Sequence, residues 1–271
     1  MSREWNEAYR EAVELVWRHW SPPMQGEIAR HCAGWAPGRF DFRVYLDASV
    51  ERFRRAYEGA VVRTGAASVC DVGGFWGVFP LTLAMLGYQA SMTEALGYYS
   101  SAWDGLFAAL SDAGVEVIDY DPFAAAADPL PRRWDAVTAL AVLEHYPHSP
   151  AAFLRAVAGG VRPGGVVYLE VPNIAFWPKR LAMLRGRSPL PPVADVFASA
   201  TPFTGHHREY TAAELAEVAE LAGLEVVAAG HFNYSPPPGG VRGTLRRPVD
   251  ALVYALFPRT RECLSVACRP R

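Results

Sequence analysis

Short apolar runs rich in β-branched residues alternate with helical stretches from residue 67 onward. Alternation of this kind predicts a mostly parallel sheet with helices on both faces, which is the doubly wound α/β fold class. A final run at 262–268, close to the C-terminus, predicts an antiparallel edge strand. With it the chain has seven expected strands, and the other six are 67–72, 89–93, 115–119, 134–140, 166–171 and 224–229.

Helical periodicity flanks this series on both sides. Apolar residues between 3 and 20 recur at three- and four-residue steps, which predicts an amphipathic helix that stops at the Ser-Pro-Pro turn after it. A second helical stretch, 49–64, leads into the first strand. Farther along, Thr211 and Glu214 have the spacing of a capping box, so we expect a helix to begin at Thr211 and to end before Gly223.

Composition limits the partners that such a chain can have. With 51% hydrophobic and 20% charged residues among 271, it can bury a sizeable core as one domain. Its formal net charge of -2 provides no broad basic field, which disfavours a nucleic acid partner. We expect a cytoplasmic protein without a membrane span, because the sequence shows neither a signal-peptide pattern nor an apolar run of about 18 residues. Monomer and homodimer both remain open.

A glycine-rich turn follows the first strand and leads into a helical run. Glycines at such a turn let the backbone approach a ligand closely and leave the first amides of the helix free to bind it. The turn carries Gly73, Gly74 and Gly77, whereas Phe75 and Val78 stand where a dinucleotide fingerprint would need further glycines. The pattern therefore indicates a bound cofactor but disfavours a pyrophosphate, and with it a nicotinamide oxidoreductase.

The chain resembles the class I methyltransferases of the type 11 or type 23 group over residues 66–230. In that family an acidic residue and a G-x-G-x-G loop lie against the methionine part of S-adenosylmethionine. Asp71, Gly73 and Gly77 match this pattern, while Phe75 replaces the usual middle glycine. The resemblance also rests on the fourth-strand segment 134–145 and on the Arg-Pro-Gly-Gly turn before the fifth strand. It implies S-adenosylmethionine as the cofactor.

Further cofactor contacts are implied beyond this loop. Glu94 ends the second strand about 20 residues past the glycines, where a carboxylate can accept hydrogen bonds from both ribose hydroxyls. The family pattern places an acidic residue by the adenine amino group, and we favour Asp121 over Asp119 for this role. The expected cofactor-binding residues are Asp71, Gly73, Gly74, Phe75, Gly77, Glu94, Asp121 and Leu140.

Three residues are candidates for the chemistry of methyl transfer. Glu144 and His145 follow the fourth strand, at the edge of the sheet where open α/β sheets bind ligands. A histidine suits deprotonation of a hydroxyl, and His206 is a second candidate base. The alternative roles are structural: His145 would orient its loop or bond the cofactor, and His206 would pack under a lid.

A metal is not expected at this turn. Related quinone-pathway O-methyltransferases carry a Glu-x-x-Glu-His motif there that is thought to hold a divalent cation, but this chain has Ala141 at the first acidic place. The turn also lacks the Asn/Asp-Pro-Pro-aromatic pattern of amino methyltransferases, which disfavours a nucleobase amine as acceptor.

The chain is expected to fold as a single domain whose insertion covers the acceptor. The stretch 174–205 is too long for an ordinary connection, which is typical of a lid or binding loop. Its four basic residues would grip an anionic group or, as we favour, form a solvated face: Lys179, Arg180, Arg185 and Arg187. The four parts are a helical extension, a cofactor-binding core, a lid or acceptor segment and the rest of the sheet: 1–64, 65–173, 174–210 and 211–271.

These features together predict an O-methyltransferase of small molecules, with a sugar, phenolic or polyketide-like hydroxyl as acceptor. The choice of oxygen rests on the histidine bases. N- or C-methylation by the same fold is the nearest alternative. A third hypothesis is a cofactor-binding scaffold without activity. The replacement of the middle glycine by Phe75 favours this hypothesis, whereas the presence of Glu94, Glu144 and His145 argues against it.

Overall fold

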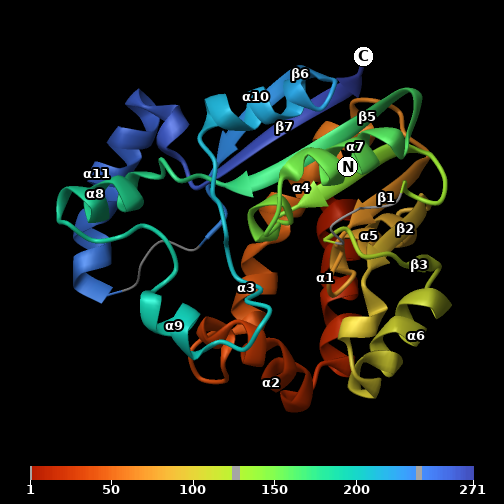
Figure 1. Ribbon diagram of the computed structural model, residues 1–271, viewed down its shortest axis with the longest axis horizontal. Coiled ribbons are helices and arrows are strands. Elements are labelled where there is room, and N and C mark those ends of the chain that lie inside the picture. The colour runs from red at the N-terminus through yellow and green to blue at the C-terminus, as the bar shows by residue number, and fades with distance from the viewer. Residues whose placement is uncertain (1, 124–128, 236–239) are drawn as a thin grey trace.

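The computed structural model describes residues 2–123, 129–235 and 240–271, and its centre is a seven-stranded sheet (Figure 1). The strands lie in the order β3-β2-β1-β4-β5-β7-β6. All seven expected runs form strands, which confirms the doubly wound α/β prediction. Their bounds are Ser68–Val72 (β1), Gln89–Glu94 (β2), Val115–Asp119 (β3), Trp134–Leu140 (β4), Val161–Pro172 (β5), Leu224–Phe232 (β6) and Cys263–Pro270 (β7).

The position predicted for the last strand is wrong. β7 is antiparallel to its neighbours, as expected, but it lies between β5 and β6, and β6 is the edge. The six residues 263–268 are all buried, which is typical of a strand covered on both faces, whereas exposed positions alternate along β6. The apolar run was therefore the sign of an interior strand.

Helices cover both faces of the sheet. Strand residues of alternate parity pack into two separate cores, one beneath each helical layer. On the first face lie α1 (Ser2–His19), α5 (Val78–Met85) and α6 (Asp104–Asp112), and on the second lie α7 (Pro150–Gly159) and α10 (Ala212–Leu221). The predicted capping box of α10 is confirmed, since Thr211 Oγ1 accepts from Glu214 N at 3.3 Å and Thr211 N donates to Glu214 Oε2 at 2.8 Å.

The rest of the N-terminal extension packs against the glycine turn after β1. Its elements are α2 (Pro22–His31), a 3-10 turn (Ala33–Trp35), α3 (Phe42–Ala48), and α4 (Val50–Ala56), which continues as a π-helix over Tyr57–Val62. Phe42 lies 4.7 Å from Trp76, and Trp35 lies 6.5 Å from Phe75, between ring centroids. The extension therefore forms one wall beside the candidate cofactor loop.

The expected lid segment contains two helices, α8 (Trp177–Leu184) and α9 (Val193–Ala198), seen at the left and lower left of Figure 1. Backbone bonds tie the stretch after α9 to the end of α2: Ala200 N donates to Arg30 O at 2.6 Å and Thr204 N donates to His31 O at 2.9 Å. The segment is thus held against the N-terminal extension.

The stretch 235–240 is rich in Pro and Gly, a composition that predicts a loop. Residues 236–239 lie outside the described residues, but Gly240 begins a helix that the sequence analysis missed, α11 (Gly240–Leu256). No helix within 2–123, 129–235 and 240–271 is both long and apolar enough to cross a membrane.

Gly77 is a position where a side chain cannot be accommodated. Its φ is +73°, and a Cβ there would lie 2.5 Å from Leu110 Cδ1. We expect Gly77→Ala to lower the free energy of unfolding by about 2 to 4 kcal/mol, because backbone strain and overpacking add. The measurement is urea unfolding, with Gly97→Ala as the control, since Gly97 has no neighbour within 4 Å. Equal losses in the two variants would contradict this assignment.

Candidate functional site

The glycine turn lies at the carboxyl end of β1, beside the end of β2. Gly73 N donates to Thr93 O at 3.0 Å, which fixes the turn against β2. Gly73 has a φ of +69°, a region that glycine enters without steric cost. A Cβ at Gly74 would lie 3.0 Å from Met92 Cβ, so the backbone approaches β2 closely there. Residues 73–75 of the turn are partly exposed, so their backbone is accessible at the strand ends.

Phe75 has a left-handed backbone conformation, a region that glycine enters more easily than other residues. Its φ is +52°, which costs a non-glycine residue about 1 to 2 kcal/mol. The Phe75 ring is packed among other rings, with centroids 4.1 Å from Trp76, 5.9 Å from Trp103 and 6.5 Å from Trp35. The burial of this ring among its neighbours offsets part of the backbone strain.

Two buried carboxyl groups lie beneath the turn. Asp71 accepts a hydrogen bond from Thr138 Oγ1 at 2.6 Å, and burial raises the pKa of Asp71 to about 7. Glu94 accepts from Phe75 N and, at 2.8 Å, from Tyr99 Oη. Burial likewise raises the pKa of Glu94 to about 7. Both groups can therefore gain from a ligand that donates hydrogen bonds or carries positive charge.

These residues fit S-adenosylmethionine. The accessible backbone of the turn matches the close approach that the methionine part requires, and each oxygen of Glu94 keeps a lone pair for a ribose hydroxyl. Tyr99 was missed by the sequence analysis, since nothing in the pattern connected it to Glu94.

The two adenine candidates and Leu140 lie near the same edge. Asp119 Oδ1 accepts from Leu96 N at 3.0 Å, and Asp121 Oδ1 accepts from Phe123 N at 2.8 Å. Leu140, the last residue of β4, is buried. Both aspartates cap loop amides, so the preference for Asp121 stays a prediction.

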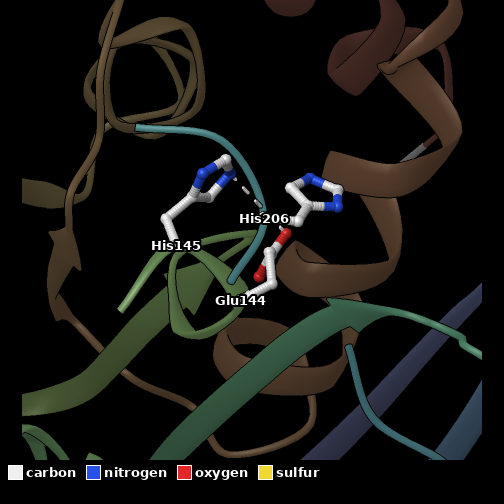
Figure 2. A group of neighbouring side chains, drawn as sticks. All are labelled: Glu144, His145 and His206. Carbon is white, nitrogen blue, oxygen red and sulfur yellow. Dashed lines mark ion pairs between the residues drawn. The ribbon is translucent and has the colours of Figure 1, made fainter. Parts of the chain in front are cut away.

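A second group of side chains lies at the carboxyl end of β4. Glu144 and His145 belong to a 3-10 turn, Leu143–His145. His207 N donates to Glu144 O at 2.7 Å, which brings the neighbouring His206 to the same place from far along the chain. Figure 2 shows the Glu144 carboxylate with the two imidazoles around it, and the rings lie 4.8 Å apart. The structure thus brings together all three predicted catalytic residues.

Glu144 is the most unusual member of this group. Its side chain is 1% exposed, and neither carboxyl oxygen has a hydrogen-bond partner in the described parts of the chain. Burial raises the pKa of Glu144 to about 7. A buried carboxyl without partners is costly, so it is typical of a group kept for a ligand, a proton or a cation.

Hydrogen bonds fix the proton of each imidazole on Nδ1. His145 Nδ1 lies 2.7 Å from Thr204 O and His206 Nδ1 lies 2.9 Å from Glu209 Oε1, and because both oxygens are acceptors, each Nδ1 must donate. Each Nε2 is left as a proton acceptor. Burial lowers the pKa of His145 to about 3, so His145 is the weaker base.

The same group has the spacing of a cation site. One possible ligand atom from each of Glu144, His145 and His206 lies within 4.8 Å of the others. The sequence analysis expected no metal because it counted only two ligands at the turn. His206 supplies a third, so metal dependence becomes a question for experiment.

A buried ion pair behind this group was missed by the sequence analysis. Arg52 Nε donates to Glu170 Oε1 at 2.7 Å and Arg52 Nη1 donates to Tyr45 Oη at 2.5 Å. The guanidinium also lowers the pKa of Asp71 and of Glu144, which opposes the effect of burial. One cation from the N-terminal extension thus acts on both halves of the site.

Stability is expected to fall as the pH rises. Asp71 and Glu94 have a folded-state pKa of about 7, above their ordinary values of 3.8 and 4.5, so the folded chain binds these protons more tightly than the unfolded chain. Their stabilisation is complete below about pH 4 and is lost as the pH rises to about 7, by at most about 4 kcal/mol for Asp71 and about 3 kcal/mol for Glu94. Urea unfolding across this range measures it, and Asp71→Asn should flatten the slope. A stability that rises with pH in both proteins would contradict the assignment.

The chain is similar in sequence to known methyltransferases. Residues 43–229, more than half of the chain, match a family described as methyltransferase domain. The ubiquinone biosynthesis O-methyltransferase of Xanthomonas euvesicatoria pv. vesicatoria (strain 85-10) is 29% identical over 211 residues, which cover 76% of this chain and 82% of that protein. The enzyme of the same name from Aeromonas salmonicida (strain A449) is 37% identical over 113 residues, but the match spans only 41% of this chain and 43% of that protein.

Solved structures agree on the fold. The magnesium protoporphyrin IX methyltransferase of Synechocystis PCC 6803, solved with bound SAH, superposes with a TM-score of 0.52 at 14% identity. The superposition covers 88% of this chain and 91% of that one. At this identity the likeness concerns the fold alone.

Proposed function

Since the chain belongs to the family of S-adenosylmethionine-dependent methyltransferases, we propose that it methylates a hydroxyl group of a small molecule and that His206 accepts the hydroxyl proton. The observation that carries this proposal is the convergence of Glu144, His145 and His206 at the end of β4. The convergence matters because methyl transfer requires little beyond alignment of the acceptor and removal of its proton.

The cofactor site of this proposal is the first group of residues. Asp71 and the accessible backbone of Gly73 and Gly74 hold the methionine part, and Glu94 accepts hydrogen bonds from the ribose. S-adenosylmethionine supplies an electrophilic methyl group on a sulfonium and leaves as a neutral thioether. Asp71 and Glu94 are drawn to their ionised forms by the positive charge of this ligand.

The second group removes the proton of the acceptor. The hydroxyl proton passes to Nε2 of His206, which would free the oxygen to take the methyl group that S-adenosylmethionine supplies. We choose His206 over His145 because Glu209 accepts the hydrogen bond of His206 Nδ1 at 2.9 Å and so orients Nε2 as the acceptor, whereas burial lowers the pKa of His145 to about 3. Glu144, beside both rings, stabilises the imidazolium once it has formed.

An oxygen acceptor is favoured over a nitrogen or carbon acceptor on two grounds. A hydroxyl must lose its proton to become a good nucleophile, and the site provides a neutral imidazole for that step. The two relatives described above are named as ubiquinone biosynthesis O-methyltransferases. The expected acceptor is a sugar, phenol or natural-product scaffold.

The test is a transfer assay with S-adenosylmethionine that carries a ¹³C methyl group, against panels of hydroxylated, amino and carbon acceptors. We expect a product whose ¹³C shift is that of a methyl ether, formed equally well with and without a chelator. A methylamine or C-methyl product would overturn the oxygen acceptor. Loss of activity with the chelator and recovery with a divalent cation would assign the three side chains as metal ligands instead of a base.

A further inference from the structure

Glu209 lies behind His206 and bridges it to the lid. Its side chain is 3% exposed, its Oε1 lies 2.9 Å from His206 Nδ1, and its Oε2 forms an ion pair with Lys179 Nζ. Lys179 belongs to α8, the first lid helix, and its side chain is 21% exposed. The three groups form a chain that runs from a lid helix to the base.

Each oxygen of Glu209 has a separate partner. The Lys179 ammonium is only a donor, so it needs an acceptor on its side, and Oε1 accepts the proton of His206 Nδ1. Burial alone would raise the pKa of Glu209, but the hydrogen bonds and charges of His206 and Lys179 lower it below the ordinary value of a glutamate. Glu209 is therefore ionised. This arrangement leaves a single tautomer for His206, with the lone pair on Nε2.

We propose that Glu209 is a positioning residue that holds His206 in the tautomer with an unprotonated Nε2, and that Lys179 of the lid helix fixes the orientation of the residue 209 side chain behind this ring. The inference rests on the proposed function, in which His206 is the base. It adds that a cation on the lid helix α8 orients the side chain that sets the tautomer of the base.

Replacement of Glu209 by glutamine provides an unusually specific test. In Glu209→Gln the amide oxygen must turn to Lys179, so the amide NH₂ faces His206 Nδ1 and forces the proton onto Nε2. We expect the opposite tautomer and a fall in kcat of about 10- to 100-fold, by analogy with the wrong-tautomer effect in catalytic triads. In Glu209→Gln/Lys179→Met the amide is free to turn back, so the original tautomer and most of the activity of Lys179→Met should return.

The primary readout is the ¹⁵N spectrum of the histidine side chains at mildly alkaline pH, which reports the tautomer and needs no acceptor. The His206 signals among the seven histidines are assigned by comparison with His206→Ala. Glu209→Gln/Arg180→Met is the matched control, since Arg180 is the next residue on α8 but donates to Ala175 O instead, and it should not restore the tautomer.

Each outcome is informative. A tautomer switch in Glu209→Gln that is reversed by Lys179→Met but not by Arg180→Met supports the inference. An unchanged tautomer in Glu209→Gln, or the same effect from both second substitutions, overturns it while leaving the proposed function intact. If the tautomers behave as expected but His206→Ala keeps full activity, the proposed function fails and the positioning chain does not serve catalysis.

Discussion

Replacing His206 by alanine is expected to lower kcat by about 10²- to 10⁴-fold, the usual contribution of a positioned general base. The dissociation constant for S-adenosylmethionine should stay near that of wild type, because His206 lies at the end of β4 and not at the glycine turn. Steady-state kinetics with an acceptor from the transfer assay, together with calorimetry of the cofactor alone, separate these two quantities.

The neighbouring histidine provides the control for this prediction. His207 is exposed, and its Nε2 contacts Phe203 O at 2.9 Å, so His207→Ala should leave kcat within about threefold of wild type. If His206→Ala and His207→Ala lose activity equally, the proton is accepted elsewhere and the assignment of the base is wrong.

The second large effect is expected at the cofactor. Glu94→Ala should weaken binding of S-adenosylmethionine by roughly 1.5 to 3 kcal/mol, or about 10- to 150-fold, which is the scale of hydrogen bonds to a charged group. The substitution also removes the acceptor for Phe75 N and Tyr99 Oη. Calorimetric titration of each variant measures the loss.

Two further variants identify its cause. Glu94→Gln keeps an acceptor for Phe75 N but lacks the charge, so an intermediate loss of affinity assigns part of the effect to the carboxylate. Tyr99→Phe removes one donor to Glu94 without touching the carboxylate, and it should change affinity far less than Glu94→Ala. Unchanged affinity in Glu94→Ala would remove Glu94 from the ribose site.

The order of the strands shows where prediction from sequence succeeds and where it fails. Strands and the capped helix α10 follow from local patterns, since alternation of apolar runs and the Thr211–Glu214 capping box depend on neighbouring residues. The place of β7 depends on pairing with β5 and β6, which lie far away along the chain. A pattern of buried residues identifies a strand as interior but does not name its neighbours.

The site shows the same division. Asp71, Glu94 and Glu144 could be predicted because parallel strands end at one edge of the sheet, so residues that follow different strands meet there. The contact of Arg52 with Glu170 joins residues 118 positions apart, across the N-terminal extension, and no local signal indicates it.

Glu209 is a different case, because a signal was present. It follows His206 by three residues, a separation at which a carboxylate reaches a ring nitrogen, yet the sequence analysis considered only His206, as a candidate base or as packing under a lid. The proposed positioning role of Glu209 depends also on Lys179, which pairs with the other carboxyl oxygen and lies 30 residues away along the chain. The sequence shows which residue types are present, but it does not show which side chains pair with one another.

Calorimetric titration with S-adenosylmethionine and with its demethylated product, using NAD as the comparison ligand, tests the central claim most directly. It asks whether the turn that contains Phe75 holds the cofactor of the family. The account predicts micromolar binding of both sulfur nucleosides and no binding of NAD. Failure of both to bind would mean that Phe75 closes the site, and it would contradict a methyltransferase reaction for this chain.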